Sequence, residues 1–256
     1  MAAVCFTLFA GELRAKENVT EQEIRQIICQ IDNGNYQGAE ADLEKVLQKD
    51  PQNVYALRLL PGVLANQIKK GDKSPENIAR IRKAIQAYEQ SLKKLQFPAE
   101  EGRSVEFFVI DLYGRISEEE KKAFLLKKAE DPTLPAEERR NAYGSLAVAL
   151  NTCANDITGT PPVQGIAIKA GKQIYVYTKP RKAEDFNRLK NCTANGMELI
   201  DKAIEIEKQS GKESAATWSL KADFLLQKMR IAEMEGKTEE KEQLRTEIDA
   251  ARKRYR

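Results

Sequence analysis

The sequence contains no histidine, and this absence excludes several classes of enzyme and metal site. Without an imidazole, the chain cannot form a Ser-His-Asp or Cys-His catalytic arrangement, and it cannot bind a metal ion through histidine. Pairs of carboxylates remain an alternative for acid–base chemistry, and the run of three glutamates at 118–120 is one example. Charge runs on helices usually form solvated faces, so we predict that the protein is not an enzyme and uses no cofactor.

Cysteine is also scarce, and its spacing excludes two further kinds of site. No two cysteines form a CxxC motif, so neither a zinc knuckle nor a thioredoxin-type redox site is expected. The four residues are Cys5, Cys29, Cys153 and Cys192. The sequence therefore predicts no metal site and no catalytic residue.

A strong excess of charge of one sign is absent as well. The chain has 42 lysines and arginines and 39 aspartates and glutamates, which gives a net charge of +3, and both signs are interleaved along it. Nucleic-acid binding needs a clustered basic face, so we expect no nucleic-acid partner.

Long hydrophobic runs are missing too. The apolar run at 2–10 is far shorter than the roughly 20 residues that a membrane-spanning helix needs, so no transmembrane span is expected. Its length fits the apolar part of a secretory signal, although no basic segment precedes it. We interpret residues 1–19 as the remnant of such a signal, with a short apolar helix packed on the following residues as the alternative. The first interpretation predicts export to the periplasm or cell envelope, and the second leaves a cytoplasmic location open.

The sequence is rich in the spacing of apolar residues that is typical of amphipathic helices. Over residues 20–53, two apolar stripes at helical spacing are separated by a break at Gly34, and Pro51 ends the second stripe. The stripes comprise Ile24, Ile27, Ile28 and Ile31, and then Tyr36, Ala39, Leu43, Val46 and Leu47. Two helices and a tight turn within 34 residues form a helical-hairpin repeat.

This unit resembles a tetratricopeptide repeat (TPR). The second-helix signature of that family is matched by Gly34, Asn35, Tyr36, Ala39, Leu43, Val46 and Pro51. The first helix departs from it, because Gln26 and Ile27 stand where the family has a large apolar residue followed by a small one. The resemblance implies an all-α fold, a TPR-like right-handed α-solenoid of about five helix pairs over residues 20–253. It also relates the chain to bacterial TPR proteins of unassigned function.

More degenerate copies of the pattern follow the first unit. Pro61 is expected to kink or restart one helix, and Ser117 with Glu120 forms a capping box at the start of another. Gly236 is expected at the turn before the last helix. One helix pair is interrupted by an insertion at about 157–182.

The insertion reads as a β-hairpin. We predict a three-residue loop at 169–171, because a two-residue loop would place Lys169 directly opposite Lys172. The predicted register puts Ile166, Ile168, Ile174 and Val176 on one face and Ala167, Gln173, Tyr175 and Tyr177 on the other. We expect the isoleucine face to pack on the helices, with a partner contact through the tyrosine face or the strand edge as the alternative.

Two cysteines lie on the helices that flank the insertion. Cys153 follows the apolar stripe of the helix before it, and Cys192 follows the stripe of the helix after it. If the two helices pair antiparallel, both sulfurs lie at one level, and a disulfide would close the base of the insertion. Such a bond would require an oxidising compartment. Two buried thiols remain the alternative.

The function expected from the TPR resemblance is that of a non-enzymatic scaffold or adaptor, which binds a protein or peptide in the concave groove or at the hairpin. The resemblance places on that groove the residues Asn141, Gly144, Val148, Asn151, Asn155, Ser219, Asp223 and Gln227. Tyr175 and Tyr177 are the candidates on the hairpin. The alternative is a structural or self-associating component of the cell envelope, and homo-oligomers are left open.

Overall fold

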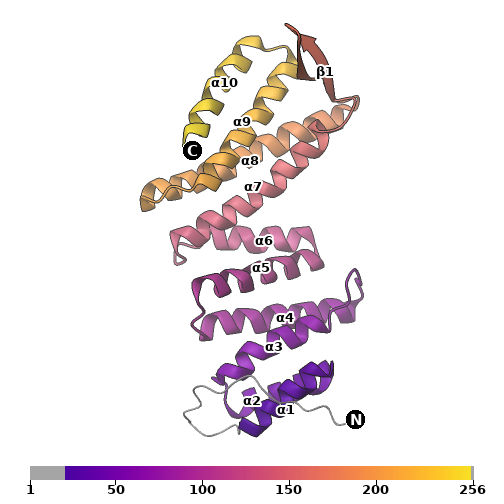
Figure 1. Ribbon diagram of the computed structural model, residues 1–256, viewed down its shortest axis with the longest axis vertical. Coiled ribbons are helices and arrows are strands. Elements are labelled where there is room, and N and C mark those ends of the chain that lie inside the picture. Colours follow the sequence, from indigo (N-terminus) through magenta and orange to yellow (C-terminus); the bar gives the residue numbers. More distant parts are fainter. Residues whose placement is uncertain (1–20, 255–256) are drawn as a thin grey trace. The chain divides into compact units, whose positions relative to one another are not determined.

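The computed structural model describes residues 21–254 and shows a mostly helical protein (Figure 1). Ten helices and one two-stranded sheet occupy those residues, so the all-α class with a single inserted hairpin is confirmed. The chain divides into two compact units, between Lys121 and Lys122. Residues 1–20, which include the interpreted signal remnant, lie outside the described residues.

The elements follow the order expected from the amphipathic stripes. The first unit contains α1 (Glu21–Asp32), α2 (Tyr36–Lys49), α3 (Val54–Asn66), α4 (Pro75–Lys94) and α5 (Ala99–Ile116), and α6 (Glu118–Glu130) spans the boundary. The second unit contains α7 (Ala136–Thr158), β1 (Gln164–Lys169), β2 (Lys172–Tyr177), α8 (Ala183–Ser210), α9 (Ala215–Glu235) and α10 (Thr238–Lys253).

Local chemistry explains where these helices begin and end. Gly34 has φ +74° at the α1–α2 turn, and the Asn35 side chain then accepts the Gly38 N–H to cap α2. α3 continues through Pro61 as one helix. The Ser117 hydroxyl accepts the Glu120 N–H, as the capping box predicts.

Within the first unit, consecutive helices from α1 to α5 pack on one another, and small residues of α2, α3 and α4 lie in the core. Ala39, Ala56 and Ala84 are completely buried, beside large buried side chains such as Leu43 and Ile81. A small residue at a helix contact lets the two backbones approach closely, while the larger neighbours fill the remaining space.

A polar cluster connects three helices of this unit. Lys83 on α4 pairs with Glu40 and, at 2.7 Å, with Glu44, both on α2. Gln67, which ends α3, donates to Glu40 at 2.6 Å. Burial opposes ionisation of Glu40, but the hydrogen bonds from Lys83 and Gln67 outweigh it and lower the pKa of this carboxyl. Burial likewise acts against the Lys83 charge, and the two glutamates outweigh it and raise the pKa of the ammonium.

This cluster predicts a pH-dependent contribution to stability. Because the folded-state pKa of Glu40 is lowered, its stabilisation is present above the ordinary value of 4.5 and is lost as the pH falls through the lower folded value. Glu40→Gln should therefore cost about 0.5–1 kcal/mol of unfolding free energy at neutral pH, and much less at an acid pH well below the ordinary value of 4.5. Urea denaturation followed by circular dichroism at both pH values measures the difference. Glu119→Gln on α6 is the control, and a Glu40→Gln cost that does not change with pH would contradict the assignment.

Within the second unit, α7 packs on α8, α8 on α9, and α9 on α10. Helices α8 and α9 meet at Gly196 and Phe224. A Cβ atom at this glycine would lie 2.2 Å from two ring carbons of the fully buried Phe224. The absence of a side chain at Gly196 is therefore what allows the Phe224 ring to fill this contact.

The hairpin differs from its predicted register. Lys169 pairs with Lys172 across a two-residue turn, in which Ala170 has φ +51° and Gly171 has φ +73°. The predicted three-residue loop is therefore wrong. Two positive φ values give the turn a twist that matches the strands. Both lysines are exposed at the tip, where solvent and salt screen their repulsion, so turn geometry outweighs the like-charge penalty.

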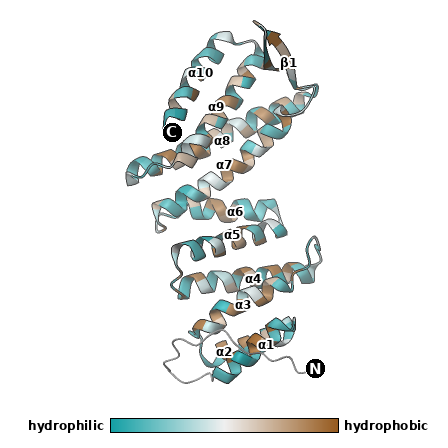
Figure 2. Cartoon of the chain, in the orientation of Figure 1, coloured by the Kyte–Doolittle hydropathy of each residue, from teal (hydrophilic) through white to brown (hydrophobic). Residues whose placement is uncertain are grey.

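The change of register also changes the two faces. Ile166 stands opposite Tyr175 and Ile168 opposite Gln173, so these four side chains share one face, and Ile174 lies on the other face with Ala167. Ile166 is 64% exposed and Ile168 is 77% exposed. The prediction that an isoleucine face packs on the helices is therefore wrong. Figure 1 shows the hairpin at the ends of α7 and α9, and Figure 2 shows hydrophobic colour on its β1 arrow.

Candidate functional site

The residues expected to face a partner lie on two helices that contact each other, α7 and α9. From α7 come Asn141, Val148, Asn151 and Asn155, and from α9 come Ser219, Asp223 and Gln227. Val148 is 53% exposed, Asn141 is exposed, and Asn151 and Ser219 are half-buried. A hydrogen bond between the two helices joins Asn155 to Gln227, whereas nothing in the described part of the chain brings Asn141 or Ser219 next to them.

Gln227 is the exception on this surface, because only 1% of it is exposed. Its amide nitrogen donates to Asn155 Oδ1 at 2.7 Å, and its carbonyl oxygen accepts from the Thr158 hydroxyl at 3.2 Å. A side chain held between two helices in this way cannot contact a partner. The expected binding role of Gln227 is therefore corrected to that of a polar link between α7 and α9.

Arg230 extends this link to the hairpin, and the sequence pattern did not identify it. Its guanidinium donates to the Thr158 hydroxyl at 3.1 Å and lies 4.7 Å from the centre of the Tyr177 ring. The Tyr177 backbone N–H donates to Glu233 Oε1 at 3.4 Å. Half-buried Tyr177 therefore anchors the hairpin to α9, whereas Tyr175, 64% exposed, is open to a partner.

Two of the predicted residues, Asp223 on α9 and Asn151 on α7, have polar groups in unusual surroundings. Burial raises the pKa of the Asp223 carboxyl, against the opposing effect of the positive charges of Arg230 and Arg252. The Oδ1 atom of Asn151 is buried without a hydrogen-bond partner. The buried Asn151 oxygen is out of reach of a ligand, whereas Asp223 is exposed, so of the two only Asp223 is open to a partner.

A disulfide closes the base of the insertion. Cys153 on α7 and Cys192 on α8 are bonded, with their Cα atoms 6.2 Å apart. The bond lies in a cluster of buried apolar residues that includes Leu189 and Val163, the residue just before β1. Together with the Tyr177 contacts, the disulfide fixes the root of the hairpin while its strands remain exposed.

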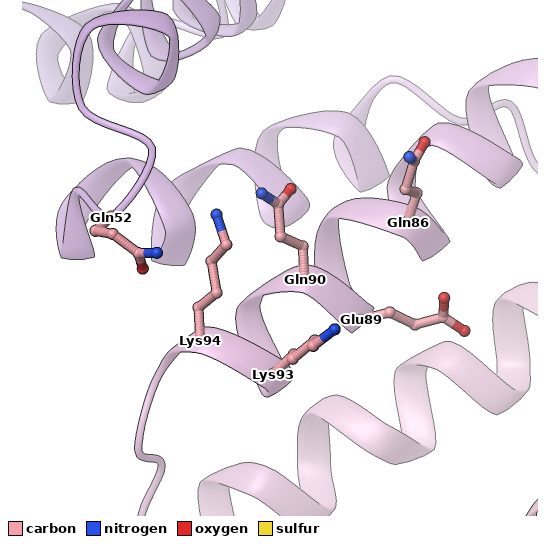
Figure 3. A pocket seen from close by; sticks show the side chains of 6 residues that line it. All are labelled: Gln52, Gln86, Glu89, Gln90, Lys93 and Lys94. Atoms are coloured by element: carbon pink, nitrogen blue, oxygen red, sulfur yellow. The ribbon is translucent and has the colours of Figure 1, made fainter.

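The first unit contains an open hollow of about 830 Å³ (Figure 3). Gln52, in the turn before α3, lies across from Gln90 and Lys94 of α4, and the remaining lining residues are Gln86, Glu89 and Lys93. The Lys94 ammonium already donates to the Pro51 carbonyl at 2.7 Å. All six lining side chains are polar or charged.

The described residues 21–254 contain no group of three or more Cys, Asp or Glu side chains that could hold a metal ion. None of the helices over that range has both the length and the apolar character needed to cross a bilayer. The chain matches no family model and no curated protein.

Proposed function

We propose that the protein is a non-enzymatic scaffold of TPR-like helix pairs that binds a protein or peptide partner at the hairpin and the adjoining α7–α9 surface. The observation that carries this proposal is the exposure of large apolar side chains on the hairpin. Ile166, Ile168 and Tyr175 share one face of the hairpin, and each is at least 64% exposed. Contiguous exposed apolar residues on a soluble domain are typical of interaction sites.

The TPR-like part of the proposal is supported by helix packing. Small residues occupy helix contacts in both units, as a repeated helical hairpin requires: Ala39 and Ala84 in the first, and Ala203 and Gly196 in the second. Helix α7 contacts α9 as well as α8, and first helices of successive TPR-like pairs would meet in this way.

The non-enzymatic part is supported by the residues available for chemistry. The sequence has no histidine. Of the glutamates at 118–120, Glu118 pairs with Lys121 at 3.5 Å, and Glu120 forms a two-bond pair with Arg82 on α4. These carboxylates act as partners of surface cations, so nothing about them requires a catalytic role.

The proposal is tested by cross-linking and affinity capture of a tagged protein from extracts of the source cells, including the cell envelope. The double variant Ile166→Ser/Tyr175→Ser should lose the captured partner, because both side chains are exposed and available for contact. Phe107→Ser is the matched control, since Phe107 is a 71% exposed aromatic residue on α5. Capture of the same proteins by wild type and the hairpin variant, or of none by wild type, would contradict the proposal.

A further inference from the structure

Charge is distributed unusually around the hairpin. Residues 157–183 contain no aspartate or glutamate. The same segment contains five cations, Lys169, Lys172, Lys179, Arg181 and Lys182. The hairpin therefore carries two exposed lysines at its tip, and three further cations follow β2 along the chain.

The hairpin also presents an open strand edge. The Thr178 N–H donates to the Val163 carbonyl, so these two residues form a hydrogen-bonded pair across the hairpin. In an antiparallel pair of strands, hydrogen-bonded and non-hydrogen-bonded residue pairs alternate along the ladder. The register then makes Ala167–Ile174 a bonded pair and directs the N–H and C=O groups of Ile166 and Ile168 away from β2. Neither isoleucine makes a hydrogen bond to another part of the described chain. β1 therefore offers unpaired backbone groups at the same residues whose side chains are exposed.

The edge of β2 is less available. β2 contacts α9, and its Tyr177 N–H is taken by Glu233. A strand that pairs with the hairpin would therefore meet less obstruction along β1 than along the full length of β2.

We propose that the open edge of β1 binds an extended acidic segment of a partner protein, which adds as a third strand. This inference rests on the scaffold function proposed above and names the chemistry of the partner. The backbone of the added strand forms hydrogen bonds with the outward N–H and C=O groups of Ile166 and Ile168. Every second side chain of that strand then covers the exposed isoleucine side chains. Its carboxylates meet the cations at Lys169 and Lys172 and at the base of the hairpin, which steers the encounter and sets the preference for acidic sequences.

Two other occupants of the hairpin are disfavoured by the same observations. A lipid bilayer would leave the outward N–H and C=O groups of Ile166 and Ile168 without hydrogen bonds in an apolar medium, which is unfavourable. A second copy of the hairpin would bring five cations against five, with no anion from either segment to compensate.

The test uses the full chain and fluorescein-labelled peptides in which valine alternates with glutamate or, as a charge control, with lysine. Fluorescence anisotropy should show binding of the glutamate peptide, weakening as salt is added, and at least about tenfold weaker binding of the lysine peptide, a factor that corresponds to 1.4 kcal/mol. Hydrogen exchange should slow at the Ile166 and Ile168 amides when the glutamate peptide is bound.

Proline substitutions identify the edge. Ile168→Pro removes an outward N–H of β1, and Gln173→Pro removes an outward N–H of β2 at the directly opposite position. Neither change deletes a bond between the two strands, so both variants should keep the hairpin. Ile168→Pro should abolish peptide binding, Gln173→Pro should retain it, and Ile168→Ser, which keeps the N–H, should bind more tightly than Ile168→Pro.

Several outcomes would overturn the inference. Equal effects of Ile168→Pro and Gln173→Pro would reject the β1 edge. Binding to vesicles of phosphatidylglycerol and phosphatidylcholine, with no peptide binding, would assign the surface to a bilayer. Light scattering that shows dimers which depend on the hairpin would assign this surface to contact with a second copy of the chain. If affinity capture depends on the hairpin but the captured partner binds equally well to Ile168→Pro, the acidic strand is rejected while the scaffold function stands.

Discussion

Replacing both Cys153 and Cys192 by serine should lower the free energy of unfolding of the second unit by about 4 kcal/mol. The two cysteines are separated by 39 positions in the sequence, and the bond between them restricts the unfolded chain. In the chain-entropy treatment, a loop of about 40 residues accounts for this magnitude. Cys192 is also only 8% exposed, so a serine there places a hydroxyl among apolar neighbours.

Trp218 provides a convenient probe for this measurement. It is the single tryptophan of the chain and lies on α9, so its fluorescence reports on the second unit. Urea denaturation should show a lower midpoint for the double variant, and a reductant should lower the wild-type midpoint similarly while leaving the variant unchanged. Cys29→Ser, on α1 of the first unit, is the control for loss of a sulfur. Two titratable thiols at these positions in the wild type, or a midpoint that a reductant does not move, would show that the bond does not form.

The redox state of Cys153 and Cys192 also indicates in which cellular compartment the protein resides. Disulfides persist in oxidising compartments and are rare in the cytosol. Thiol titration of protein isolated from its own cells under alkylating conditions should therefore find Cys153 and Cys192 bonded if the expected export occurs. Two alkylated thiols would instead favour the cytoplasmic alternative.

The helices of this protein could be predicted from sequence because local signals agree with the packing. Ile24 and Ile27 lie on the predicted stripe of α1 and are buried, and Gly34 takes the left-handed conformation expected of it. Helical spacing, a cap and a stop residue are all encoded within a few positions, so a single sequence is enough to read them.

The hairpin register could not be predicted in the same way, because two local effects conflict. Repulsion between Lys169 and Lys172 favours a longer loop, whereas the tighter turn suits the twist of the strands. The outcome depends on solvent exposure of the two ammonium groups, which is a property of the folded chain. A one-residue difference then decides which side chains share a face with Ile166 and Ile168, and with it the composition of the candidate site.

In the candidate site, too, features set by neighbouring residues could be predicted from the sequence, and features set by distant residues could not. The α7 and α9 residues were predicted from the TPR resemblance, in which the repeat pattern sets which positions face the same way. The roles of Thr158 and Arg230 depend on contacts with residues about 70 positions away, such as Gln227, and no local pattern encodes such contacts. Gln227 itself was placed on the correct helix, but its burial required knowledge of the neighbour that covers it.

Gly196→Ala should destabilise the second unit by roughly 1–3 kcal/mol, although the substitution ordinarily favours a helix. Alanine has the higher helix propensity by about 1 kcal/mol, so propensity alone predicts stabilisation. At this position the new Cβ would fall 2.2 Å from the Phe224 ring, and Phe224 has no exposed surface through which it could move away. Overlap in a packed core should therefore outweigh the gain in propensity. Urea denaturation followed by Trp218 fluorescence measures the change.

A control and a double-mutant cycle separate the two effects. Gly144→Ala on α7 adds a methyl group with no atom within 4 Å, so it should stabilise the unit by about 0.5–1 kcal/mol. Phe224→Leu alone should cost about 1 kcal/mol because it removes ring atoms from the core. In the Phe224→Leu background, however, Gly196→Ala should cost much less unfolding free energy than in the wild type. The difference is a coupling free energy of about 1 kcal/mol or more. Additive costs would mean that the ring and the glycine do not share this space, and the close approach of α8 and α9 would then need another cause.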